Sequence, residues 1–108
     1  MIKLPQEIVN DLFVKGILYE YVQILKETTN TNAIVQLAFK FEDHYKLILW
    51  AVIDEQNEEI YDKTESAIYK TEAILSAEYR QYGVSFETLV WEKSNKVTLP
   101  PDFNRIIL

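Results

Sequence analysis

The chain has 108 residues and a net charge of −6, and 48% of its residues are apolar. This length suits one domain, and the apolar content is too high for a disordered chain. The absence of cysteine excludes disulfides and thiolate chemistry. Because 11 Lys and Arg residues face 17 Asp and Glu residues, little basic surface is available to neutralise phosphates, and we expect no nucleic-acid binding.

The amino-terminal residues up to Pro5 lack the apolar segment of a signal peptide. The longest apolar run, over residues 47–53, is only about a third of the length that a membrane-spanning helix needs. We therefore expect a cytoplasmic protein that does not associate with membranes.

A short helix is predicted at the amino terminus, over about residues 5–15. Pro5 suits the first helical position, where its missing N–H would have no partner, and Gly16 suits the left-handed residue that ends many helices. The next segment, 17–27, is rich in Ile, Tyr and Val, and as a helix its apolar residues would point all round the axis. We predict a strand there, with a continued helix as the alternative.

Two strands are predicted in the middle of the chain, over residues 33–41 and 45–53, after a polar loop over 28–32. The first alternates between apolar and polar residues, which is typical of a half-buried strand. The second is apolar on both faces, which indicates a central strand or one covered on both sides. The turn between them contains the only histidine, His44.

A long helix is predicted from about residue 56 to residue 82, with Asp54 as its N-cap and Gly83 closing it. A stripe of residues at helical spacing should face the sheet. Its members are Ile60, Thr64, Ala67, Ile68, Thr71, Ile74, Leu75 and Tyr82.

A strand over residues 84–91 and a short edge strand over 97–99 complete the predicted elements. The predicted fold is a single α+β domain over residues 1–108. It contains one mostly antiparallel sheet in the order α-β-β-β-α-β, with the helices packed mainly on one face.

Few residues suggest chemistry. His44 could act as a general base, although a histidine in a hairpin turn needs no such role. Asp54 and Glu55 could bind Mg²⁺ where a strand runs into a helix, but capping explains Asp54 without a ligand. The sequence has no glycine-rich phosphate loop and no nucleophile motif. We therefore expect no catalysis, cofactor or metal. The alternative is a ligand-binding domain or minor enzyme with a pocket of carboxylates and tyrosines around these three residues.

The side of the long helix opposite the predicted core stripe is not uniformly polar, as it would be on an ordinary exposed helix. It carries Asp62, Ser66, Tyr69, Ala73, Ser76 and Arg80. This set is nearly symmetric about Thr71, so that an antiparallel copy would bring Asp62 against Arg80 at both ends. We predict a homodimer through this face.

Trp50 is a second candidate interface residue. Its face of the sheet is either covered by the first helix or open to a partner. The leading hypothesis is a small acidic protein-interaction module of adaptor or inhibitor type, homodimeric and without catalysis. A nucleic-acid binder would instead need a basic patch, which could only be assembled from Lys3, Lys15, Lys40 and Lys46.

Overall fold

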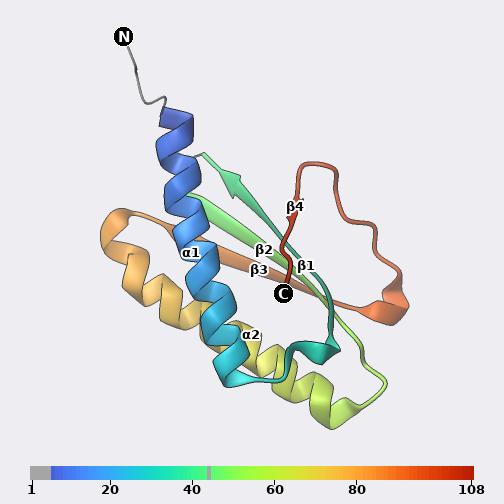
Figure 1. Ribbon diagram of the computed structural model, residues 1–108. Coiled ribbons are helices and arrows are strands. Elements are labelled where there is room, and N and C mark those ends of the chain that lie inside the picture. Colours follow the sequence, from blue (N-terminus) through green and yellow to red (C-terminus); the bar gives the residue numbers. More distant parts are fainter. Residues whose placement is uncertain (1–5, 44) are drawn as a thin grey trace.

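The computed structural model describes residues 6–43 and 45–108, with side chains from Leu12 onward. It confirms the α+β class (Figure 1). The elements in chain order are α1 (Gln6–Thr28), η1 (Thr31–Ala33), β1 (Ile34–Glu42), β2 (Lys46–Ile53), α2 (Glu58–Tyr79), η2 (Arg80–Tyr82), β3 (Ser85–Glu92), η3 (Lys93–Asn95) and β4 (Asn104–Arg105), where η marks a 3₁₀ turn.

The described strands form one mixed sheet in the order β3-β2-β1-β4. β1 pairs with both β2 and β4 in antiparallel fashion, whereas β2 and β3 run parallel from Lys46 opposite Ser85 to Ile53 opposite Glu92. Because β2 and β3 run in the same direction, the chain must return to the end of the sheet where β2 begins before β3 can start. The helix α2 makes this connection.

The strand predicted over residues 17–27 is wrong, because α1 is one continuous helix that passes through Gly16. The alternative of a continued helix is the observed one. Its apolar residues point in several directions because only some of them face the core, whereas Leu12 and Tyr19 are exposed. Ile17, Tyr21 and Leu25 are buried in the core, whereas Phe13 packs against aromatic residues at the end of α2. The predicted start at Pro5 lies outside the described residues.

Both helices cover the same face of the sheet (Figure 1). On α2, the predicted core stripe is confirmed for Thr64, Ala67, Ile68, Thr71 and Leu75, which are all buried. The two buried threonine hydroxyls donate to the carbonyl four residues earlier, so they add no unpaired donor to the core.

The remaining members of the predicted stripe, Ile60, Ile74 and Tyr82, are exposed. Tyr82 belongs to η2, after the α-helix has ended, so helical spacing no longer sets its direction. Ile60 belongs to the first turn of α2, where the core is interrupted by a cavity described below.

The N-cap of α2 is Asn57 rather than Asp54. The Asn57 Oδ1 atom accepts a hydrogen bond from the Ile60 N–H at 3.0 Å, which satisfies one of the free donors of the first turn. Asp54 instead accepts from the Gln56 N–H at 3.0 Å and shapes the preceding loop. Gly83 has the predicted left-handed conformation, with φ of 74°, but it follows η2 rather than α2 itself.

Trp50 is only 4% exposed, so the open patch considered for it is absent. The residues that cover it come from the carboxyl-terminal part of the chain and not from the first helix. Its ring centre lies 5.5 Å from that of Trp91 and 5.7 Å from that of Phe103. The Trp50 Nε1 atom donates to Gln36 Oε1 at 2.9 Å. The predicted edge strand over residues 97–99 is not a strand. It belongs to the segment over residues 97–103, called the covering segment below, whose residues Val97, Leu99 and Phe103 pack against the cluster that contains Trp50.

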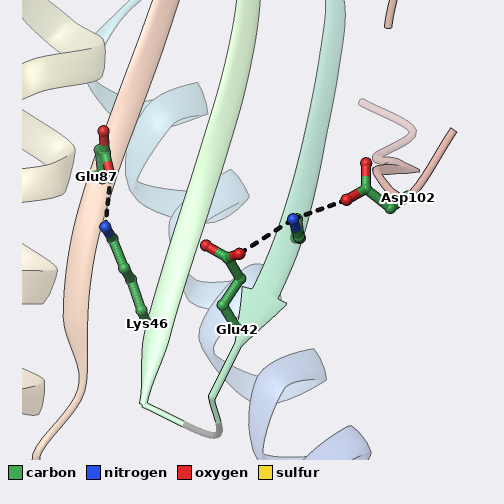
Figure 2. A network of polar contacts seen from close by, with 5 residues as sticks. Glu42, Lys46, Glu87 and Asp102 are labelled. Atoms are coloured by element: carbon green, nitrogen blue, oxygen red, sulfur yellow. Dashed lines mark ion pairs between the residues drawn. The ribbon is translucent and has the colours of Figure 1, made fainter. Parts of the chain in front are cut away.

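The charged side chains beside this covered patch form ion pairs (Figure 2). Lys40 Nζ lies 2.7 Å from Asp102 Oδ2 and 3.1 Å from Glu42 Oε2, and Lys46 Nζ lies 2.8 Å from Glu87 Oε2. Hydrogen bonds to these carboxylates, with Asp102 first for Lys40 and Glu87 for Lys46, raise the pKa of both lysines. Lys40 and Lys46 are therefore already neutralised and offer no free basic patch.

The Lys40–Asp102 ion pair also attaches the covering segment to β1. Close to it, β4 pairs with β1, and the Ile106 N–H donates to the Leu37 carbonyl at 2.8 Å. Lys3, another residue of the hypothetical basic patch, lies outside the described residues. In the described part of the chain, no helix has the length and apolar character required to cross a bilayer.

Candidate functional site

The outer face of α2, defined as Asp62, Ser66, Tyr69, Ala73, Ser76 and Arg80, is uncovered in the single chain. Ser76 is half-buried and the others are exposed, including the Tyr69 ring at 44%. Arg80 is the first residue of η2, yet its φ of −56° and ψ of −39° are still helical. It therefore continues the line of the helix, and the six residues form one surface.

The two charged residues of this face lie at its opposite ends. Asp62 and Arg80 are separated by about 27 Å along the helix axis, which is far too long for an ion pair within one chain. Among the ion pairs of the described residues, none includes either of them. Each charge is therefore available to a second molecule.

Tyr69 lies near the middle of the outer face. Partial burial and the nearby charges of Glu65 and Glu72 raise the pKa of its hydroxyl, which therefore stays protonated and can donate a hydrogen bond. Ala73 lies one turn further on the same side of the helix. A large ring with a polar tip next to a small residue provides both a projection and a space that could receive one.

Of the predicted alternative pocket, the structure describes Asp54 and Glu55 but not His44. Asp54 and Glu55 follow β2, whereas Asp43 and Tyr45, which flank His44 in the sequence, lie at the other end of this strand, about 25 Å away. His44 itself lies outside the described residues. A pocket that combines these three residues therefore stays a prediction.

Asp54 and Glu55 instead connect the ends of the two parallel strands. Glu55 Oε1 accepts from the Ser94 N–H at 3.1 Å, and Asp54 Oδ2 lies 3.8 Å from Lys93 Nζ. The hydrogen bonding to Ser94 lowers the pKa of Glu55. Both carboxylates thus hold the loop before α2 against η3, which is a structural role.

A cavity of about 640 Å³ opens next to this loop, at the end of the molecule where α1, η1 and the start of α2 lie together (Figure 1). Its lining residues are mostly small and polar. They are Thr28, Thr29, Asn30, Asn32, Ala33, Asp54, Gln56, Asn57, Ile60, Lys63 and Thr64.

Of the residues proposed from the sequence for a pocket, the cavity contains Asp54 alone. The other lining residues were missed because the polar segment 28–32 has the composition of an ordinary loop. A signal was nevertheless present in the sequence, since carboxamide residues are concentrated both in that loop and just before α2.

A smaller hollow of about 380 Å³ adjoins the cavity and shares Thr28, Thr29 and Lys63 with it. It continues along α2 towards Lys70 and includes Asp62 and Ser66 of the outer face. The cavity and the outer face of α2 are therefore neighbouring surfaces.

Two acidic side chains meet between the helices. The Tyr79 hydroxyl donates to Glu20 Oε2 at 2.7 Å, and the Glu78 carboxyl lies beside the same Glu20. Hydrogen bonding between the two carboxyl groups, followed by desolvation and charge repulsion, raises the pKa of Glu78. This cluster belongs to the packing of α1 on α2 and makes that contact sensitive to protonation.

The surfaces described above could bind another molecule. The described residues contain no group of three or more His, Cys, Asp or Glu side chains that could hold a metal ion. The two surfaces that remain are an uncovered helix face and a polar cavity beside it. Comparison of the chain with protein families, curated proteins and solved structures finds no significant match.

Proposed function

We propose that this protein is a small acidic interaction module of the cytoplasm, without catalysis, that forms a homodimer and acts as an adaptor or inhibitor of another protein. The observation that supports the proposal is the outer face of α2, which is exposed and whose residues are nearly symmetric about Thr71 in the sequence. A two-fold interface requires that the same residues meet their own partners in reverse order.

In the proposed dimer, two copies of α2 pack in antiparallel orientation about an axis near Thr71. Asp62 of each copy then faces Arg80 of the other, and Tyr69 packs against Ala73. The ion pairs at both ends determine the orientation, while burial of the tyrosine ring supplies most of the affinity.

Charge reversal tests this geometry directly. Asp62→Arg places two like charges at each end of the interface, and so does Arg80→Asp. We expect each single variant to raise the dimer dissociation constant at least tenfold. The double variant restores opposite charges and should recover most of the affinity, because Asp62 and Arg80 cannot pair within one chain.

The mass in solution is measured by light scattering coupled to gel filtration, over a range of protein concentrations. Ala73→Glu should yield a monomer, because it buries a charge at the centre of the interface. Gln81→Glu, an exposed substitution with the same charge change on η2, is the matched control and should leave the dimer intact. A monomeric wild-type protein, or a dimer unaffected by Ala73→Glu, would refute the proposed interface.

A further inference from the structure

The cavity at the end of α1 exposes an apolar side chain that would otherwise belong to the core. Ile60 is 48% exposed although it continues the buried stripe of α2. Ile60 lines the cavity together with Ala33 and Thr64, so the cavity takes the place of the neighbouring side chain that would otherwise cover Ile60. The floor of the cavity is therefore suited to an apolar surface of a ligand.

Hydrogen bonds set the direction of two carboxamides at the rim. Asn30 Oδ1 accepts from the Asn32 N–H at 2.9 Å, and Asn57 Oδ1 accepts from the Ile60 N–H at 3.0 Å. Because the oxygens are engaged by the backbone, the two NH₂ groups remain as donors. They can be satisfied by hydroxyl or carbonyl oxygens of a bound molecule.

Three further lining side chains carry polar groups that the fold does not use. Within the described part of the chain, no hydrogen bond involves the side chain of Thr29, Asn32 or Gln56. The Asn and Gln side chains each offer both a donor and an acceptor. The lining can therefore exchange several hydrogen bonds with a ligand and lose none of those that stabilise the protein.

The charges around the cavity are paired with one another. Lys63 Nζ lies 3.1 Å from Glu59 Oε1, and Asp54 Oδ2 lies 3.8 Å from Lys93 Nζ. An anionic ligand would have to compete with Glu59 for Lys63, at the acidic first turn of α2. The electrostatics thus favour an uncharged ligand.

We propose that this cavity binds an uncharged small molecule rich in hydroxyl or carbonyl oxygens, with an apolar face and about the size of a nucleoside or a disaccharide. The volume of about 640 Å³ lies within the usual range for small-molecule sites. The cavity adjoins the loop that follows β2, which contributes Asp54, Gln56 and Asn57 to its lining. This ligand site is separate from the proposed function and does not depend on a dimer.

The test is a titration of the full chain followed by two-dimensional ¹H–¹⁵N NMR. The neutral probes are adenosine and maltose, which distinguish a nucleoside from a sugar as the source of the oxygens. AMP and inorganic phosphate are the charged probes. We expect one neutral probe at millimolar concentration to shift the signals of residues 28–33 and 54–64, including the side-chain NH₂ groups of Asn30 and Asn57.

Variants connect the shifts to the cavity. Asn32→Ala and Gln56→Ala each remove a side chain that has no hydrogen bond within the described fold, so we expect normal folding and about fivefold weaker binding. Asn95→Ala, at an exposed position on η3, is the matched control and should bind as the wild type does. Three results would each overturn the proposal: no shift with either neutral probe, stronger binding of AMP or phosphate than of the neutral probes, or equal binding by all three variants.

Discussion

Gly16 provides a direct test of the continuous first helix. It lies within α1 and is exposed, and a Cβ atom added to it would meet no heavy atom within 4 Å. Alanine is the better helix former by about 1 kcal/mol, because glycine loses more backbone entropy on folding. Since the new methyl group has open space, we expect Gly16→Ala to stabilise the protein by about that amount.

This free energy corresponds to a measurable change in the melting temperature. The entropy of unfolding is about 2.1 cal/mol/K per residue, so a chain of 108 residues melts about 4 °C higher for each kcal/mol of stabilisation. Thermal unfolding followed by far-ultraviolet circular dichroism would resolve this shift, and urea denaturation would give the free energy itself.

Gly83→Ala is the matched control, because the same substitution there should have the opposite sign. Gly83 has a φ of 74°, and a Cβ atom in this left-handed conformation costs about 1 kcal/mol. We therefore expect Gly83→Ala to lower the melting temperature by about 4 °C. If Gly16→Ala destabilised the protein as much as Gly83→Ala does, Gly16 would end a shorter helix and the continuous α1 would be refuted.

Three other predictions concern the α2 cap, the helix contact and the covered tryptophans. Asn57→Ala should lower the free energy of unfolding, measured by urea denaturation, by about 1 kcal/mol, which is more than the effect of Asp54→Ala, because only Asn57 caps α2. Equal losses of stability in the two variants would contradict this assignment. Glu78→Gln should stabilise the protein at neutral pH. The folded-state pKa of Glu78 lies above its unfolded value, so ionisation opposes folding. The gain should disappear below about pH 4, where Glu78 is protonated in both states, and a gain that persisted at low pH would exclude this cause. Phe103→Ala should uncover Trp50 and shift the tryptophan emission to longer wavelength, at a cost of about 2 kcal/mol. Unchanged emission would show that Phe103 does not shield the indole rings.

The sequence predicted well those elements in which the spacing of apolar residues reflects burial against a neighbouring layer of the structure. Thr64, Ala67, Ile68, Thr71 and Leu75 recur at helical spacing because α2 has a single buried stripe. β1 was located correctly, but its burial does not alternate, because Val35 is exposed at a register irregularity and Ala38 is buried on the opposite face of the sheet. The buried run 46–53 was recognisable as a strand covered on both sides. In each case the pattern is set by which face the neighbouring layer covers.

The candidate site was predictable only in part. The outer face of α2 follows from helical geometry alone, so its exposure could be expected once the helix was recognised. The cavity could not, because Thr28, Asn32 and Gln56 come from three separate segments that meet only in the folded chain.

The sequence by itself determined the α+β composition, the hairpin of β1 and β2, and the buried stripe of α2. Tertiary structure decided the rest. α1 continues through Gly16 because Val14, Ile17, Leu18, Tyr21 and Leu25 are buried together in the core, and this burial outweighs the helix propensity of one glycine. The parallel pairing of β2 with β3 and the covering of Trp50 depend in the same way on contacts between distant segments, which no local period encodes.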